Sequence, residues 1–321
     1  MRVCVHHRAS AGFSRTLREA APASIDLDFV PEDDREALAR SLETAEALLH
    51  VLEPLSRDTL VRAPRLLLVQ KIGVGVNTID VAACQELGIG VANMPGTNTQ
   101  AVAEHALALL LAALRRIPEL DTATRAGRGF PVDPALLDVA GEVSGRTVGL
   151  VGYGAVSARL APVLVALGAR VVVSTRDANK SPYPVLSVDD LVATADVVSL
   201  HLPLTPDTKH LLSATRIATM KPGAVLVNTS RGGLVDQPAL VVALREGRLR
   251  AAGLDVFADE PTLPDDAILT LSNVVATPHI AWRTPETLSR SFAIAMRNCL
   301  AARAGTPLEH EVLAVRRRTG A

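Results

Sequence analysis

The chain has 321 residues, which is enough for two domains of ordinary size. Hydrophobic residues make up 48% of it and charged residues 21%, a balance that excludes a disordered chain and fits a globular protein with a substantial core. The formal net charge of −1 gives no electrostatic reason to expect nucleic acid or a membrane surface as a partner.

Cysteine usage and hydropathy favour a reducing, aqueous compartment. Cys4, Cys84 and Cys299 lie far apart and form neither a zinc pattern nor a disulfide framework. The N-terminal residues MRVCVHH lack the apolar region of a signal peptide, and the longest apolar stretch, 106–114, is far too short to span a bilayer. We therefore expect a cytoplasmic protein that does not enter a membrane.

Short apolar runs alternate with helical patterns along the chain. The first series predicts strands at residues 2–6, 25–29, 47–51, 65–69 and 89–93. A second series predicts strands at residues 147–151, 170–174, 196–200, 224–228, 251–256 and 273–277. Continuous Val and Leu runs separated by helices are typical of parallel sheets covered on both faces. We therefore predict an α/β fold with two Rossmann-like, doubly wound parallel-sheet domains.

Two long helical patterns mark the junctions between the domains. The segment 97–116 has a polar start and then apolar residues on nearly every face, which is typical of a helix buried on all sides. We interpret it as the crossover into the second domain, packed also against another subunit, and we therefore expect a homodimer. The segment 284–305 begins with Thr284, Pro285 and Glu286, a typical helix start, and is the natural return helix to the first domain.

These junctions predict a discontinuous first domain. It would comprise residues 1–96 and 290–321 and bind the substrate, while residues 97–289 would form the dinucleotide-binding domain. The last nine residues, LAVRRRTGA, are basic and end near a glycine, and we expect them to fray.

Residues 146–174 read as strand, glycine-rich turn, helix and strand, which is the context of a dinucleotide-binding motif. Gly152 would allow the tight turn, and Gly154 would let the backbone approach a pyrophosphate closely. The amides of Ala155 and Val156 would open the helix whose positive end faces that anion. The third glycine position holds Ser157, which is also small. The alternative is that these glycines only let strand and helix pack closely.

Several long motifs follow one another in a single order: GRTVGLVGYG, LHLPLTPDTKHLL, MKPGAVLVNTSRGGLVDQPAL, GLDVFADEP and NVVATPHIAW. Together they resemble the D-isomer-specific 2-hydroxyacid dehydrogenase family. KIGVGVNTID and NMPGTNTQAVAEHALALLLA resemble the substrate-domain loop and the inter-domain helix of the same family. The resemblance covers roughly residues 65–300 and implies an NAD(P)-dependent oxidoreductase acting on the CH–OH group of its donor.

The resemblance also implies a catalytic triad of Arg231, Glu260 and His279, each just beyond the end of a predicted strand. Ligands of open α/β sheets bind at these carboxyl ends, so the three side chains could reach one crevice. His279 would donate the proton that a ketone oxygen takes up as hydride reaches the carbon. Glu260 would orient the imidazole and favour its charged form, and Arg231 would bind the substrate. Taken singly, each is also an ordinary turn or loop residue.

Substrate contacts follow from the same resemblance. The family loop that matches GVGVN implies that the amides of Val74 and Gly75 bind the substrate carboxylate. Asn98 is expected to line the cleft, with capping of the following helix as the alternative. Asn77 stands where the family often has Asp, a departure that the sequence does not explain. Trp282 is expected beside the substrate, with core packing as the alternative, and PHIAW resembles the hydroxypyruvate and glyoxylate reductase branch.

The strand that ends VVVSTRD predicts which cofactor is preferred. Thr175 sits where NAD-linked members of the family place an Asp, and Arg176 follows it directly. The missing acid removes an acceptor for the ribose 2′-hydroxyl, and Arg176 adds a donor fork for a 2′-phosphate, with Ser174 and Thr175 as hydroxyl partners. We expect NADP(H) to be preferred and NAD(H) to be possible, the alternative being a solvated arginine. The matched motifs imply further cofactor contacts at Pro203, Thr229 and Asp255.

The sequence therefore predicts an enzyme that reduces a small 2-keto acid, similar to glyoxylate or hydroxypyruvate, to the D-2-hydroxy acid with NADPH. One alternative is an NAD-linked phosphoglycerate-type dehydrogenase. Another is a nucleotide-sensing regulator, because the family includes corepressors that keep the triad. No metal is expected, since no cluster of His, Cys and carboxylates has the spacing of metal ligands.

Overall fold

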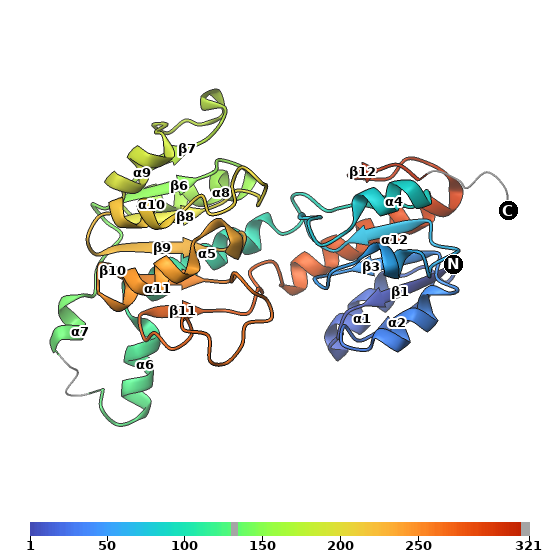
Figure 1. The fold of residues 1–321 in the computed structure, drawn as a ribbon, viewed down its shortest axis with the longest axis horizontal. Coiled ribbons are helices and arrows are strands. Elements are labelled where there is room, and N and C mark those ends of the chain that lie inside the picture. The colour runs from blue at the N-terminus through green and yellow to red at the C-terminus, as the bar shows by residue number, and fades with distance from the viewer. Residues whose placement is uncertain (130–133, 316–321) are drawn as a thin grey trace. The chain divides into compact units, whose positions relative to one another are not determined.

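The computed structural model describes residues 1–129 and 134–315, which fold into two compact units (Figure 1). The first unit comprises Met1–Asn98 and the chain from Arg283 on, and the second unit comprises Thr99–Trp282. Each unit contains one six-stranded sheet covered by helices, so the predicted fold of two α/β domains with parallel sheets is confirmed (Figure 1).

The sheet of the first unit has the strand order β12-β5-β4-β3-β1-β2. Its strands are β1 (Arg2–His6), β2 (Asp26–Val30), β3 (Ala47–His50), β4 (Leu68–Lys71), β5 (Gly90–Ala92) and β12 (Glu311–Leu313). Strands β1 to β5 are parallel, and β12 is antiparallel to β5. The order β2-β1-β3 reverses the direction in which the chain adds strands, so the carboxyl ends of β1 and β3 form a topological switch point.

Helices cover both faces of this sheet. They are α1 (Ala11–Ala20), α2 (Arg35–Leu42), α3 (Arg57–Leu60), α4 (Val81–Leu87) and α12 (Pro285–Ala304). Leu38, Leu42 and Leu60 join the core cluster on one face of the sheet. On α1 and α12, Phe13 and Phe292 meet edge to face with their ring centroids 4.8 Å apart. Helix α12 begins as predicted, with the Thr284 hydroxyl accepting a hydrogen bond from the Thr287 amide.

The sheet of the second unit has the order β11-β10-β9-β8-β6-β7, with every pairing parallel. Its strands are β6 (Thr147–Val151), β7 (Arg170–Ser174), β8 (Val197–Leu200), β9 (Ala224–Asn228), β10 (Leu249–Leu254) and β11 (Val274–Ala276). Helices α9 (Val188–Thr194), α10 (Ala214–Thr219) and α11 (Gln237–Arg245) contribute to the apolar cluster on one face. Helices α5 (Thr99–Leu114) and α8 (Ala155–Ala166) cover the other face. Its switch point lies between β6 and β8.

Helix α5 is buried within this chain on only part of its surface, and the predicted packing of the rest against another subunit stays a prediction. Leu109, Leu110 and Leu114 are buried in the apolar cluster beneath the sheet, but Glu104 and Ala108 are exposed. The face that the sheet and α8 leave uncovered therefore remains open within this chain. The chain continues into α6 (Ile117–Arg125), none of whose residues is buried, and into α7 (Pro134–Asp138).

The C-terminal segment also departs from the prediction. Leu313, the first residue of the tail expected to fray, instead belongs to β12, where it is paired with Val91 of β5. The pairing covers an edge strand that would otherwise present unpaired backbone groups. The rest of the expected frayed tail from residue 316 on lies outside the described residues.

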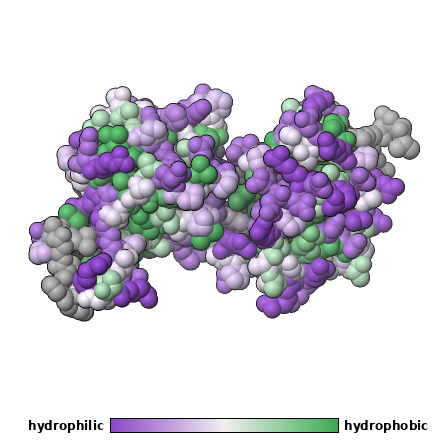
Figure 2. Space-filling model, turned by 60° about the horizontal axis from the view of Figure 1, so that its bottom comes forward, coloured by the Kyte–Doolittle hydropathy of each residue, from purple (hydrophilic) through white to green (hydrophobic). Residues whose placement is uncertain are grey.

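The visible surface is mostly hydrophilic, with small apolar patches between the polar residues (Figure 2). Among the described residues, none of the helices is both long and apolar enough to cross a membrane.

Candidate active site

The glycine turn joins β6 to α8 at the switch point of the second sheet. Gly152 has a φ of +94°, and a Cβ atom there would lie 2.3 Å from the carbonyl oxygen of His201, so only glycine fits. Gly154 has an ordinary backbone conformation, and a Cβ atom there would have no neighbour within 4 Å. The Ser157 hydroxyl donates a 2.6 Å hydrogen bond to the Gly152 carbonyl oxygen and fixes the turn. Open space therefore lies at Gly154, directly before the helix that Ala155 and Val156 begin.

The end of β7 presents Ser174, Thr175 and Arg176. The only acid close by in sequence, Asp177, caps a short 3₁₀ helix, η1 (Ala178–Lys180), by accepting a 3.1 Å hydrogen bond from the Asn179 amide. The Thr175 hydroxyl contacts the backbone of Asp177 at 3.4 and 3.5 Å. Arg176 is exposed, and within the described part of the chain its guanidinium has no hydrogen bond or ion pair. An exposed guanidinium without a partner among the described residues therefore follows the end of β7.

Two further predicted cofactor residues follow neighbouring strands. Pro203 is exposed beyond the end of β8, and Thr229 follows β9 directly. Thr229 is 8% exposed, and its hydroxyl is buried without a hydrogen-bond partner among the described residues. A buried hydroxyl without a partner is unfavourable unless a ligand or water bonds to it.

His279 and Glu260 form a direct pair beyond the ends of β11 and β10. The imidazole Nδ1 of His279 lies 2.7 Å from the Oε2 atom of Glu260, and the Phe257 amide donates to Oε1 at 3.0 Å. Burial alone would raise the pKa of Glu260, but the hydrogen bond and charge of His279, the Phe257 amide and the charge of Arg231 outweigh it and lower that pKa. Glu260 is therefore a carboxylate at neutral pH, and it orients the ring with Nε2 left for another partner.

The backbone of His279 is held in a conformation that residues other than glycine rarely adopt, with φ at +53°. Its amide donates a 2.8 Å hydrogen bond to the Asp255 carbonyl oxygen. Its own carbonyl oxygen accepts a 3.1 Å hydrogen bond from the indole Nε1 of Trp282. Trp282, expected beside the substrate, is thus a buried residue that holds the histidine backbone; a contact with substrate stays a prediction.

Arg231 lies between β9 and the 3₁₀ helix η2 (Gly232–Leu234). A Cβ atom at Gly232 would lie 1.8 Å from the Phe257 carbonyl oxygen, so this glycine lets the Arg231 loop pack directly on the loop that carries Glu260. Burial lowers the pKa of Arg231 from its ordinary value, while the charge of Glu260 works against that lowering. Arginine remains charged at neutral pH, so the second unit brings a cation, a carboxylate and an imidazole together.

Asp255, predicted to contact the cofactor, is fully buried and binds the chain itself. Its carboxylate accepts hydrogen bonds from the Thr277 hydroxyl at 2.5 Å and from the amides of Ile280 and Ala281 at 3.0 and 2.9 Å. The imidazole of His105 on α5 lies 3.5 Å from the same carboxylate. These bonds lower the pKa of Asp255 although burial alone would raise it. A contact between Asp255 and the cofactor stays a prediction.

Sequence reasoning missed the part that His105 plays in this network. Its Nε2 atom lies 2.9 Å from the Thr277 hydroxyl, which is 172 positions away in the sequence. The available signal was a histidine beside Glu104 at the start of an otherwise apolar helical stretch, where a partly buried imidazole needs a polar partner.

The predicted substrate residues Val74, Gly75 and Asn98 belong to the first unit. Val74 and Gly75 lie in the loop after β4, and within the described residues their amides have no hydrogen-bond acceptor. The Val74 carbonyl oxygen accepts a 2.8 Å hydrogen bond from the Asn93 side chain, which helps to fix the loop. Asn98 directly precedes α5, and its side chain makes no capping hydrogen bond in the part of the chain that the structure describes.

Comparisons with known proteins match this arrangement. The family model of the D-isomer specific 2-hydroxyacid dehydrogenase NAD binding domain matches residues 107–281. A glyoxylate reductase of Aeropyrum pernix is 39% identical over 83% of this chain and 82% of its own length. A D-3-phosphoglycerate dehydrogenase of Mycobacterium leprae is 40% identical over 83% of this chain, which spans only 51% of that relative. A protein of Thermus thermophilus with a known crystal structure is 38% identical, with a TM-score of 0.89 over 98% of this chain and all of the other.

The chain therefore belongs to the D-isomer specific 2-hydroxyacid dehydrogenase family, a family of nicotinamide-dependent oxidoreductases. The resemblance that the sequence motifs indicated is confirmed.

The glycine turn yields a prediction about stability. Gly152→Ala forces a methyl group against a backbone carbonyl in a left-handed conformation, and we expect it to lower the free energy of unfolding by about 3 kcal/mol or more. Gly154→Ala is the matched control and should change it by less than about 0.5 kcal/mol, because its site is open and its φ is ordinary. Chemical denaturation measures both, and equal effects of the two changes would contradict the assignment.

Proposed function

We propose that the protein reduces a small 2-keto acid of the glyoxylate or hydroxypyruvate type to the D-2-hydroxy acid, with NADPH as the preferred cofactor. The observation that carries the proposal is the pairing of His279 with Glu260 at 2.7 Å on loops packed against the Arg231 loop. The similarity to a glyoxylate reductase over most of both chains supports the same substrate class.

Two features of the second unit fit a nicotinamide dinucleotide. The space at Gly154 would admit a pyrophosphate beside the start of α8, and the unpartnered hydroxyl of Thr229 would gain a hydrogen bond. We therefore assign the second unit to the dinucleotide and the first unit to the substrate. When bound, the reduced cofactor supplies the hydride that reaches the carbonyl carbon.

The side chains would handle the remaining charge and proton. Arg231 presents a planar fork of donors for the substrate carboxylate and carbonyl oxygen, so it would stabilise the negative charge that develops as hydride arrives. The imidazolium of His279 would pass its Nε2 proton to that oxygen, while Glu260 holds the ring through Nδ1. The amides of Val74 and Gly75 would donate hydrogen bonds to the substrate carboxylate.

A second candidate is an NAD-linked phosphoglycerate-type dehydrogenase, which the 40% identity to such an enzyme favours. A panel of 2-keto acids and phosphorylated 2-hydroxy acids, each with NADPH and NADH, separates the two. Turnover confined to phosphoglycerate with NAD would replace the leading proposal.

The proposed mechanism makes a prediction about the proton donor. His279→Gln should lower turnover by a factor on the order of 10² or more while cofactor affinity stays nearly unchanged, because only the proton transfer is lost. His210→Gln is the matched control, since His210 also has a left-handed backbone, with φ at +49°. Steady-state kinetics and cofactor titration check both, and near-normal turnover of the His279 variant would remove this residue from the mechanism.

A second prediction concerns pH. The pKa of Glu260 is lowered, so its carboxylate stays charged and keeps its hydrogen bond to Nδ1 of His279 throughout the neutral range. Glu260→Gln replaces the carboxylate with an amide that does not titrate, so the fall in ketone reduction at acidic pH, where Glu260 takes up a proton and stops holding the ring, should be absent from the pH–rate profile of the variant. Asp259→Asn, a neighbouring exposed acid, should leave the pH–rate profile in place. An unshifted profile for the Glu260 variant would show that this residue acts only on loop structure.

A third prediction concerns cofactor choice. Arg176→Ala should raise the Michaelis constant for NADPH roughly ten- to a hundredfold, because a charge-assisted pair with the 2′-phosphate is lost, and should hardly change that for NADH. Lys180→Ala is the control, because Lys180 is a basic residue of the same loop that pairs with Asp177 at 3.7 Å. If the unaltered enzyme uses NADH as well as NADPH, Arg176 has no role in selecting the cofactor.

A fourth prediction concerns assembly, which we propose to be a homodimer through α5 and α6. The exposed strip of α5 continues into α6, where Ile117 is 51% exposed and no residue is buried within the chain. Sedimentation should show a dimer at micromolar concentration, and Ile117→Glu should shift it toward monomer. Val242→Glu is the control, because Val242 is 50% exposed but lies on α11, and it should leave the dimer intact. A monomeric unaltered protein would refute the assembly.

A further inference from the structure

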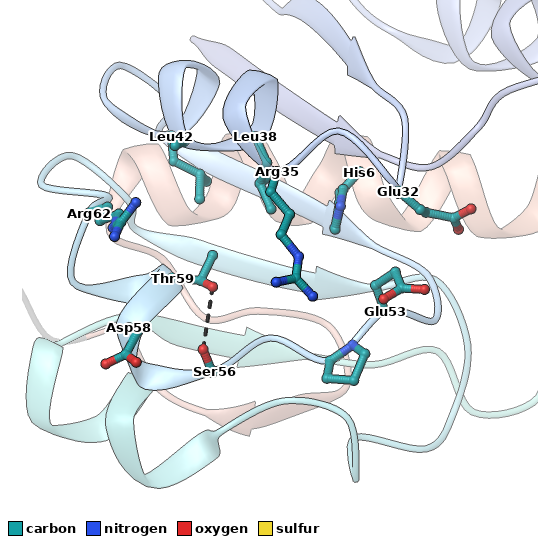
Figure 3. A pocket seen from close by; sticks show the side chains of 12 residues that line it. His6, Glu32, Arg35, Leu38, Leu42, Glu53, Ser56, Asp58, Thr59 and Arg62 are labelled. Atoms are coloured by element: carbon teal, nitrogen blue, oxygen red, sulfur yellow. Dashed lines mark hydrogen bonds between the residues drawn. The ribbon is translucent and has the colours of Figure 1, made fainter. Parts of the chain in front are cut away.

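A polar pocket of about 500 Å³ lies at the carboxyl edge of the sheet in the first unit, outside the residues assigned to catalysis. It lies between α2 and the turn of α3, and it reaches His6 at the end of β1 and Glu53 beyond β3 (Figure 3). A smaller hollow beside it shares Glu32, Arg35 and Glu53.

The topology of the sheet favours a ligand at this position. Strands β1 and β3 are direct neighbours, and the chain reverses its direction of strand addition between them. In open parallel sheets such a reversal leaves a crevice beyond the carboxyl ends of the two strands, and ligands bind in it. His6 and Glu53 stand on the two sides of that crevice.

Four charged side chains that line the pocket have no ion pair or hydrogen bond among the described residues: Arg35, Glu53, Asp58 and Arg62, of which Asp58 and Arg62 lie on the side away from Glu53 (Figure 3). The guanidinium of Arg35 extends from α2 toward the middle of the pocket (Figure 3), and among the described residues it makes no ion pair or hydrogen bond. The carboxylate of Glu53 likewise has no side-chain partner there. Beside Arg35 and Glu53, Glu32 is paired with His7 at 2.7 Å and Arg8 is paired with Asp33.

The floor of the pocket adds a buried acceptor. His6 is 5% exposed, and its Nε2 atom is buried without a partner within the described residues. Burial lowers the pKa of His6, and a hydrogen bond with the backbone of Glu32 opposes this lowering only in part. A neutral imidazole that donates through its other nitrogen presents Nε2 as an acceptor.

The remaining wall is apolar. Leu38 and Leu42 of α2 line one side of the pocket (Figure 3), and Ala39 and Pro54 also line it. An aliphatic group placed there would be removed from water, with Arg35 and Glu53 at its polar end.

We propose that this pocket binds a small aliphatic α-amino acid in its zwitterionic form. Its carboxylate would pair with Arg35, its ammonium group would donate to Glu53 and to Nε2 of His6, and its side chain would lie against α2. A simple anion would face the carboxylates of Glu53 and Glu32, and a simple cation would face Arg35, so neither complements the mouth. The site would be a second ligand site in addition to that of the reaction proposed above.

Isothermal titration of the full-length protein tests the proposal. The probes are glycine and both enantiomers of alanine, valine and leucine, with propionate and ethylamine as fragments that carry only one of the two charges. At least one amino acid should bind saturably below about 10 mM, and Arg35→Ala and Glu53→Gln should each weaken it roughly ten- to a hundredfold. Both residues are exposed, so their substitution should not unfold the chain.

Arg40→Ala is the matched control, because Arg40 lies on the same helix but pairs with Glu36 at 3.6 Å and does not line the pocket. It should leave binding unchanged. Failure of every amino acid to bind would overturn the proposal, and so would binding that the Arg35 and Glu53 variants leave intact or that propionate reproduces. None of these results bears on keto-acid turnover, so failure of this proposal would leave the proposed reaction untouched, and failure of the proposed reaction would leave this proposal untouched.

Discussion

The buried carboxylate of Asp255 is the interaction on which the candidate active site depends. A residue other than glycine at a φ of +53° costs about 1–3 kcal/mol, so the backbone of His279 needs a surrounding structure that enforces it. Asp255 provides this through its carbonyl oxygen, which binds the His279 amide, and through its carboxylate, which binds the amides of Ile280 and Ala281. Hydrogen bonds to a buried charge are stronger than neutral ones, so the loop has one favoured shape.

The same residue connects the three loops that carry the proposed catalytic groups. The Asp255 amide donates to the Asn228 carbonyl oxygen at 3.0 Å, and the Asn228 side chain donates to the Arg231 carbonyl oxygen at 2.9 Å. Gly232 then allows the Arg231 loop to touch the backbone of Phe257, whose amide holds Glu260. The relative positions of arginine, glutamate and histidine are therefore set by backbone contacts among strand ends, not by the flexible side chains themselves.

The boundaries of a strand could be predicted from the sequence where the strand is buried on both faces. The runs at 2–6, 147–151, 170–174 and 224–228 coincide with β1, β6, β7 and β9, because continuous Val and Leu residues suit only a covered parallel strand. The run at 65–69 begins before β4 because Leu66 still belongs to the preceding turn. Strand β12 was missed because its three residues are largely exposed, and only pairing with β5 makes them a strand.

In the candidate site, too, some features could be predicted from the sequence and others could not. Arg231, Glu260 and His279 could be located because each follows a strand end within a recognisable motif, and strand ends gather at one edge of a sheet. The contacts that fix them could not, since the His105 and Thr277 side chains meet across 172 positions and Trp282 bonds to a backbone atom. Such long-range polar contacts leave no periodic signal in the sequence.

The two sheets show how one topology supports different chemistry. Both reverse their strand order beside the first strand, between β6 and β8 in the second unit and between β1 and β3 in the first. In the second unit that position carries Gly152, which allows a tight turn against the His201 backbone, and Gly154, which leaves open space beside the start of α8. In the first unit the corresponding position carries His6 and Glu53 beside Arg35, and these side chains line the crevice with groups of both charges. A pyrophosphate has no place among those carboxylates, so the shared topology determines where ligands bind, and the residues at each strand end determine which ligand it is.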